Sequence, residues 1–157
     1  MQSGIIARED PRATDVTDLL SQHLVFANSH SPPEDVHALD LAELLDPAIS
    51  FFSYRVDGRL LAVGALRQLD PEHGEVKSMH TLSEARGQGI GRAMLEHLIG
   101  LARERGYRRL SLETGSMDAF ESARALYSSA GFARCEPFAD YRVSPNSACF
   151  TLLLNPE

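Results

Sequence analysis

Three glycines alternate in the segment Arg86-Gly87-Gln88-Gly89-Ile90-Gly91, and an amphipathic stretch follows at once. This pattern predicts a tight loop that leads directly into a helix over residues 90–105, which Gly106 ends. Helical spacing puts the apolar residues of that helix on one face: Met94, Leu95, Leu98, Leu101 and Ala102. Any fold for this chain must therefore place a glycine loop at the start of a helix that packs by one side.

Such a loop favours an anion. The start of a helix presents backbone N–H groups without intrahelical partners together with a partial positive charge. Glycine lets the backbone approach a ligand closely because it has no Cβ. Arg86 and Arg92 flank the loop and can add charge-assisted hydrogen bonds. A diphosphate is the ligand that this pattern fits best, and a turn that merely starts a helix is the alternative.

Two other phosphate loops do not match the segment. A Walker loop ends in Gly-Lys-Ser/Thr, and this loop does not. The dinucleotide fingerprint needs glycine or alanine three residues after its second glycine, where this chain has Arg92 or Met94, depending on the glycine counted first. The loop therefore belongs to another class of phosphate site.

The segments before the loop predict three consecutive antiparallel strands. Residues 49–56 are rich in aromatic and branched side chains, and Asp57-Gly58 gives a strong hairpin signal. Residues 59–69 form the return strand, residues 70–74 a second turn, and residues 75–82 the next strand.

After the long helix the pattern predicts a strand over residues 110–114, a helix over residues 122–130 that Gly131 ends, and closing strands over residues 132–136 and 148–154. The helical crossover predicts that strand 110–114 pairs in parallel with strand 75–82.

The N-terminal part predicts a short strand over residues 5–8, a helix that Asp15 caps, and a short helix that ends at Asp46-Pro47. The expected fold class is α/β in the broad sense: an α+β mixed sheet, mostly antiparallel at its centre, with helices on both faces. Residues 1–157 are expected to form a single domain.

Charge and composition restrict the function. The chain has 15 basic and 22 acidic residues and a net charge of -7, which disfavours a nucleic-acid partner and suits a cationic substrate. Its apolar runs are too short to cross a bilayer, and its start lacks the features of a signal peptide, so no membrane partner and a cytoplasmic location are expected.

No metal site is expected. His23, His30 and His37 recur every seven residues but fall on a helix, a loop and another helix, so their spacing does not bring them together. Cys135 and Cys149 are expected to be free thiols.

The glycine loop matches the Arg/Gln-x-x-Gly-x-Gly/Ala acetyl-CoA motif of the GNAT superfamily of N-acetyltransferases. A second segment, Ala123-Arg124-Ala125-Leu126-Tyr127-Ser128-Ser129-Ala130-Gly131-Phe132, is similar to the family's Ala-x-x-x-Tyr-x-x-x-Gly-Phe segment. The resemblance covers residues 59–154 and identifies the chain as a small stand-alone member of bacterial type, with the GNAT-like acyl-CoA N-acyltransferase fold. One departure is Phe120, where many members carry an asparagine, so the start of that helix would depend on Asp118 or Ser122.

The resemblance implies a role for each matching position. The hydroxyl of Tyr127 would reach the CoA sulfur as a proton donor, although an ordinary core residue is the alternative. Backbone groups of the central strand would polarise the thioester carbonyl and pair with the pantetheine arm. The residues expected to bind acetyl-CoA, as co-substrate and without a metal, are Met79, His80, Thr81, Arg86, Gly87, Gln88, Gly89, Ile90, Gly91 and Arg92.

Several groups are candidates for the general base. Glu75 comes first, because it corresponds to the glutamate of the histone-type members; Glu113 comes second, and His80 and ordered water are further routes. In an ideal strand Glu75 and His80 face opposite sides, and a bulge would change that parity.

The expected activity is direct transfer of acetyl from acetyl-CoA to the primary amine of a small molecule. The alternatives are a protein lysine or N-terminal acetyltransferase and a non-catalytic acetyl-CoA-binding regulatory module. Residues 28–45 and 137–147 are expected to line the acceptor pocket. The oligomeric state is left open, with a homodimer as one alternative.

Overall fold

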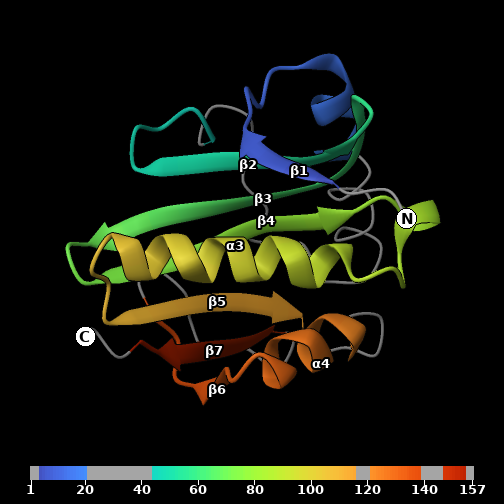
Figure 1. Cartoon of the computed structure of the whole chain (residues 1–157). Helices are drawn as coiled ribbons and strands as arrows, with labels where there is room; N and C mark the ends of the chain where they lie inside the picture. The colour runs from blue at the N-terminus through green and yellow to red at the C-terminus, as the bar shows by residue number, and fades with distance from the viewer. Residues whose placement is uncertain (1–3, 21–43, 116–120, 139–146, 155–157) are drawn as a thin grey trace.

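The structure, a computed structural model, describes residues 4–20, 44–115, 121–138 and 147–154. In this part of the chain, seven strands form one sheet in the order β1-β2-β3-β4-β5-β7-β6, and α3 lies across it (Figure 1). The strands are β1 (Ile5–Arg8), β2 (Ile49–Val56), β3 (Arg59–Asp70), β4 (His73–Thr81), β5 (Arg109–Gly115), β6 (Ala133–Cys135) and β7 (Ser147–Leu153). The helices are the 3-10 helix η2 (Ser83–Ala85), α3 (Ile90–Glu104) and α4 (Glu121–Ser129), and residues 14–20 are also helical.

The sheet is mixed, as the sequence predicts. Strands β1 to β4 pair antiparallel in chain order, and Asp57 (φ 52°) and Gly58 (φ 82°) form the tight hairpin turn between β2 and β3. The crossover through α3 makes β4 and β5 parallel. Strand β7 then lies between β5 and β6 and is antiparallel to both.

The second turn is shorter than expected. The sequence assigns residues 70–74 to it, but β4 already begins at His73. Gly74 is a strand residue, and a Cβ added there would lie 2.7 Å from two ring carbons of Tyr107. The glycine therefore makes room for a buried tyrosine instead of forming a turn.

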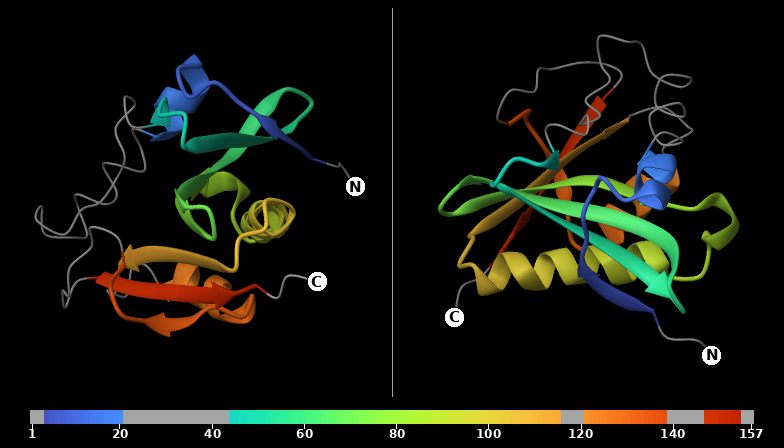
Figure 2. Two further views of the ribbon diagram at one scale, coloured as in Figure 1. Left: turned by 90° about the vertical axis from the view of Figure 1, so that its left-hand side faces the viewer. Right: turned by 90° about the horizontal axis from the view of Figure 1, so that it is seen from above.

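Two hydrophobic clusters lie on the two faces of the sheet. On one face, α3 and α4 pack through Met94, Leu95, Leu98 and Tyr127 against a cluster that includes Leu66 of β3. On the other, helical residues Val16 and Leu19 pack on strand residues that include Phe51, Val63 and Ala65. Helices thus cover both faces, and Figure 2 shows residues 14–20 and α3 as separate layers. None of the helices in the described ranges combines the length and the hydropathy needed to cross a bilayer.

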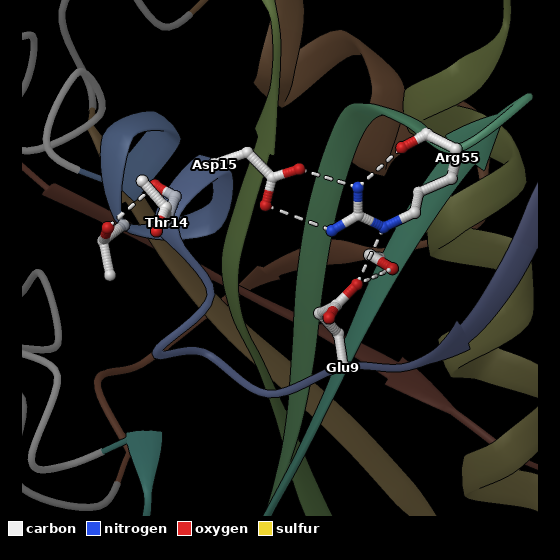
Figure 3. Close-up of polar contacts among 7 residues, drawn as sticks. Glu9, Thr14, Asp15 and Arg55 are labelled. Atoms are coloured by element: carbon white, nitrogen blue, oxygen red, sulfur yellow. Dashed lines mark hydrogen bonds and ion pairs between the residues drawn. The ribbon is translucent and has the colours of Figure 1, made fainter.

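Arg55 holds the N-terminal segment on β2 (Figure 3). Its guanidinium donates to Glu9 Oε1 at 2.9 Å and to both carboxylate oxygens of Asp15 at 2.7 and 3.2 Å. The Arg55 hydrogen bonds lower the pKa of Asp15, and Ser53 also donates to Glu9. Asp15 was expected to cap a helix, but the helix already begins at Thr14. The carboxylate instead fixes that helix to the sheet.

Candidate functional site

The glycine loop follows β4 and η2 and leads into α3, in the predicted order. Gly87 (φ 79°) and Gly89 (φ 80°) both have left-handed backbones, and Gly89 is the N-cap of α3. A Cβ added at either glycine would meet no atom within 4 Å. The backbone conformation therefore favours glycine at these positions, and the space beside them can take a ligand.

Gly91 has a different purpose. It lies in the first turn of α3, and an added Cβ would lie 3.5 Å from Leu126 Cδ2 of α4 and 3.7 Å from Thr81 Oγ1. The small residue lets α4 pack closely on the start of α3. The start of α3 is thus supported on this side by α4.

The remaining loop residues divide into supports and exposed groups. Ile90 is buried in a small cluster with Ala62 and Ala85, whereas Gln88 is exposed. Arg86 Nε donates to the Thr81 carbonyl at 3.3 Å, and Arg92 donates to the Ser129 hydroxyl of α4. Both arginines are exposed, so their charges stand at the rim of the loop.

Strand β4 carries a bulge at the position where parity matters. Its pairing with β3 passes from Ala65↔Lys77 to Val63↔His80, so β4 has one extra residue there. Ser78 has a left-handed backbone (φ 55°), which is uncommon for a residue other than glycine. Because Ala65 and Val63 lie on one face, the bulge puts His80 on the same face as Lys77. Glu75 and His80 consequently share a face, which an ideal strand would not allow.

Strands β4 and β5 pair over only a short ladder in the described part of the chain. The ladder joins His73, Gly74 and Glu75 to residues 109–111, although β4 continues to Thr81 and β5 to Gly115. Backbone groups beyond this junction, including those of Met79, His80 and Thr81, are therefore not used by a β4–β5 ladder. We use the term strand junction for this short ladder, residues 73–75 with residues 109–111, and for the point just beyond it where the pairing of β4 with β5 ends.

Glu75 lies at the strand junction and is almost fully buried. Its side chain is 1% exposed, and Oε2 lies 3.2 Å from Nζ of Lys77, which is 8% exposed. The two residues are two positions apart on one strand and so lie on one face. The charge of the buried carboxylate is thus balanced by that of the buried ammonium. Any role proposed for Glu75 must take its pairing with Lys77 into account.

A second polar group lies beside Glu75 on the same face. Arg109 Nη2 is 3.3 Å from His73 Nδ1, and His73 Nε2 is 2.7 Å from Ser111 Oγ. Ser111 Oγ is 2.8 Å from Thr151 Oγ1, whose hydroxyl donates to Cys135 Sγ at 3.2 Å. These side chains link β5, β4, β7 and β6 across the sheet.

The direction of donation along these hydrogen bonds follows from Arg109, the first residue of the series. Arginine can only donate, so His73 Nδ1 accepts and its proton is on Nε2, which donates to Ser111. Ser111 then donates to Thr151. The His73 ring is 6% exposed, and burial, followed by the nearby Arg109 charge, lowers its pKa. His73 is therefore neutral, because a proton on Nδ1 would face the guanidinium.

Tyr127 lies in α4 and packs into the core that α3 covers. It is 7% exposed, and its ring meets Phe132 edge-on at a centroid distance of 6.0 Å. Gly131 (φ 103°) ends the helix as predicted, and the Phe132 N–H donates to the Tyr127 carbonyl. Burial raises the pKa of Tyr127 to about 12, so its hydroxyl keeps its proton at neutral pH.

Glu113 lies on β5 past the strand junction, half-buried, and is the direct pairing partner of Cys149. It shares a face with Ser111, two residues earlier, and therefore with Glu75. The candidate bases Glu75, Glu113 and His80 thus come to one face of the sheet. Phe120, Asp118, the three histidines His23, His30 and His37, and most of the predicted acceptor-lining segments lie outside the described residues.

Comparisons with known proteins agree with this geometry. A family model for the acetyltransferase (GNAT) family matches residues 14–132. The chain belongs to the GNAT family of N-acetyltransferases. It is 48% identical over 143 residues to the uncharacterized N-acetyltransferase YsnE of Bacillus subtilis (strain 168), which covers 91% of this chain and 95% of YsnE.

Two further matches extend over nearly the whole chain. IAA acetyltransferase of Azospirillum brasilense is 38% identical over 150 residues, covering 94% of this chain and 95% of that protein. The solved structure of a GNAT family acetyltransferase from Elizabethkingia anophelis, with acetyl-CoA bound, has a TM-score of 0.72 at 18% identity and covers 98% of this chain and 100% of that one. The second match is a likeness of fold. The expected mixed sheet of a GNAT enzyme is therefore confirmed.

Some residues of the candidate site escape a sequence-based search. The sequence predicts that His73 lies in a turn and that Lys77 lies in a strand, with no particular role for either residue. The spacing of Glu75 and Lys77 on one strand was the available signal for their pairing, since alternate strand residues share a face. For the left-handed Ser78 the sequence offers no signal, because serine is found in every kind of structure.

Proposed function

We propose that this GNAT enzyme transfers the acetyl group of acetyl-CoA directly to the primary amine of a small molecule. The observation that carries the proposal is the combination of the strand junction with the glycine loop at the far end of β4. An extended chain can lie along β4 beyond the β4–β5 ladder while its anionic end meets the start of α3.

The residues proposed to hold the diphosphate are those of the glycine loop. The left-handed Gly87 and Gly89 open the space, and the N–H groups at the start of α3 supply donors and a partial positive charge. Arg86 and Arg92 add charge at the rim. Gln88, Ile90 and Gly91 contribute through backbone N–H groups. Bound there, acetyl-CoA supplies an activated thioester carbonyl.

Backbone groups of Met79, His80 and Thr81 are proposed to orient the arm that carries the thioester. The left-handed Ser78 turns the strand immediately before them, so their N–H groups are aimed by the bulge and not by an ideal pleat. A preorganised N–H directed at the carbonyl oxygen stabilises the charge that develops there without reorganisation.

Tyr127 is proposed to act on the leaving sulfur as a hydrogen-bond donor. A phenol whose pKa is about 12 is a much weaker acid than a thiol near 8.5, so complete proton transfer to a thiolate is unfavourable. A hydrogen bond from the hydroxyl still stabilises the developing negative charge on sulfur. The role that fits the burial of Tyr127 is therefore stabilisation of the thiolate, which a proton from the amine or from water then neutralises.

The amine must lose a proton before or during attack, and the polar face of β4 and β5 is proposed to accept it. Glu75 remains the first candidate, followed by Glu113, with His80 and ordered water as further routes. Both glutamates lie next to the strand junction, on the face away from α3. Protonation of Glu75 would leave the Lys77 ammonium without that carboxylate as its partner, so Glu75 acts most easily through water.

A small acceptor is proposed for two reasons. The net charge of -7 attracts a cationic amine, and a relative of nearly equal length bears the name of an enzyme for a small molecule, IAA acetyltransferase. A cytoplasmic location, where acetyl-CoA and free amines occur together, belongs to the same proposal.

The proposal is tested by calorimetry with acetyl-CoA on wild type, Gly89→Asp and Gly100→Asp. An aspartate tolerates a left-handed backbone and favours a helix start, so Gly89→Asp should fold, but its carboxylate should repel a diphosphate. Gly100 lies exposed in the same helix with no atom within 4 Å of an added Cβ, so it takes the same change in charge away from the loop. We expect loss of binding in Gly89→Asp alone.

A thiol-release screen with amino acids, polyamines, aminoglycosides and peptides then identifies the acceptor class. Turnover with peptides alone would contradict the small-molecule acceptor, and tight binding without turnover on any amine would indicate a regulatory module. Equal acetyl-CoA affinity of all three proteins would remove the glycine loop from the proposal.

A further inference from the structure

The two cysteines of the chain are direct neighbours across antiparallel strands. Cys135 is the last residue of β6, and its pairing partner on β7 is Cys149. Residues directly opposite in an antiparallel pair have Cα atoms about 4.5 or 5.5 Å apart, depending on the hydrogen-bonding position. Disulfides span Cα distances of about 4.4–6.8 Å, so either position lies within their range.

The contacts of the two sulfurs place both side chains on one face. Cys135 Sγ accepts a hydrogen bond from Thr151, which is two residues after Cys149 on β7 and so on the same face as Cys149. Cys135 also contributes to the electrostatic environment of Cys149: it is among the groups that raise the pKa of Cys149, after burial and Glu113. Both are free thiols in the structure, as the sequence predicts.

We propose that Cys135 and Cys149 form a peroxide-sensitive dithiol site, which closes reversibly to a disulfide between β6 and β7. Because the two residues are already paired in register, the bond needs side-chain rotation and little movement of the backbone.

The two thiols differ in access, which sets the order of the steps. Cys135 is half-buried and Cys149 is buried at 4% exposure. The Cys135 thiolate attacks one oxygen of hydrogen peroxide, the O–O bond breaks, and a sulfenic acid and water result. The Cys149 thiolate then attacks the sulfenic sulfur and displaces its hydroxyl as water. In total, two thiols lose two electrons and two protons, and one peroxide becomes two molecules of water.

The second step depends on deprotonation of Cys149. Burial, the Glu113 carboxylate and Cys135 raise the pKa of Cys149 to about 11, while a hydrogen bond from the Phe138 backbone and the Arg134 charge act in the opposite direction. Little of Cys149 is thiolate at neutral pH, so closure waits on its deprotonation and quickens as the pH rises.

The test treats the folded, reduced protein with hydrogen peroxide and measures intact mass, thiols after unfolding, and migration without reductant. We expect both thiols to disappear, the mass to fall by about 2 Da, the protein to stay monomeric on the gel, and dithiothreitol to restore the starting state. Cys135→Ser is the matched variant, because it keeps the buried Cys149 and removes its partner; it should retain one titratable thiol and show no loss of mass.

Three results would each overturn the proposal. One is a gain of about 32 Da on the peptide that carries Cys135, where it marks sulfinic acid, without the loss of about 2 Da. Another is a disulfide found only between two chains. The last is survival of both thiols at a peroxide dose that oxidises an unfolded control of the same protein.

Discussion

The buried pair of Glu75 and Lys77 makes the obvious test of a catalytic base ambiguous. Their side chains are 1% and 8% exposed, and the charged atoms are 3.2 Å apart. Removing one partner of a buried ion pair costs about 3–5 kcal/mol, because a charge stays behind in a medium that solvates it poorly. For a chain of this size about 1 kcal/mol corresponds to 2–4 °C in Tm. Glu75→Gln alone should therefore lower Tm by roughly 6–20 °C.

The double variant separates chemistry from stability. In Glu75→Gln with Lys77→Met both charges are gone, and a neutral pair of similar volume is often as stable as the ion pair. We expect it to regain most of the lost stability, with a coupling energy of about 2 kcal/mol or more in the cycle of wild type, two single variants and double variant. Thermal and urea unfolding, followed by circular dichroism, provide the four free energies.

Activity of the same four proteins, measured by thiol release with any slow amine acceptor, then ranks the base. If the stable double variant still loses kcat/KM, most strongly at low pH where neutral amine is scarce, Glu75 takes part in the chemistry. If its activity returns with its stability, Glu75 is structural, and Glu113, tested as Glu113→Gln, becomes the first candidate. A loss below about 1 kcal/mol in Glu75→Gln, without coupling to Lys77, would refute the burial argument itself.

Further predictions concern other parts of the molecule. Tyr127→Phe should lower kcat about 10- to 150-fold, the effect of one hydrogen bond to a charged group, with acetyl-CoA affinity from calorimetry unchanged; an unaltered kcat would make the tyrosine structural. The lowered pKa of His73 means that the unfolded chain binds more protons, so Tm should fall as the pH drops below about 6.5, and less steeply in His73→Gln; parallel curves would contradict this. Gly74→Ala should cost about 1–3 kcal/mol against the Tyr107 ring, whereas Gly100→Ala in the exposed helix should raise Tm; equal melting curves would count against the packing argument.

The sequence predicts the sheet well because its signals are local. The hairpin at Asp57-Gly58, the glycine that ends α4 and the helix after the glycine loop all depend on residues close together in the chain, and each stands where expected. The parallel pairing of β4 with β5 follows from the length of the crossover. Sequence therefore suffices for the order of the elements and for the loop.

The site is harder to predict because tertiary contacts decide it. The sequence predicts a turn at Gly74, but in the structure the residue lies in a strand against the Tyr107 ring. It predicts a helix cap at Asp15, but the carboxylate accepts a hydrogen bond from Arg55. The face of the sheet on which His80 lies depends on a bulge, and no residue type in the sequence predicts that bulge. The roles given to Tyr127 and to the two glutamates remain predictions: Tyr127 lies in the core on the α3 side of the sheet, whereas both glutamates lie on the opposite face.

The strand junction also divides the sheet into two parts, which we expect to separate transiently by local opening. In the described part of the chain, the backbone ladder between β1–β4 and β5–β7–β6 spans only residues 73–75 and 109–111, and the α3 core carries the remaining connection. Parts joined so narrowly open at a lower free energy than the whole domain unfolds, and their amide hydrogens exchange sooner. A molecule that binds to both parts holds them together. At a hundredfold excess over its Kd it raises the free energy of unfolding by about 2.7 kcal/mol. Occupancy of the site can therefore be followed as slower hydrogen exchange in β4.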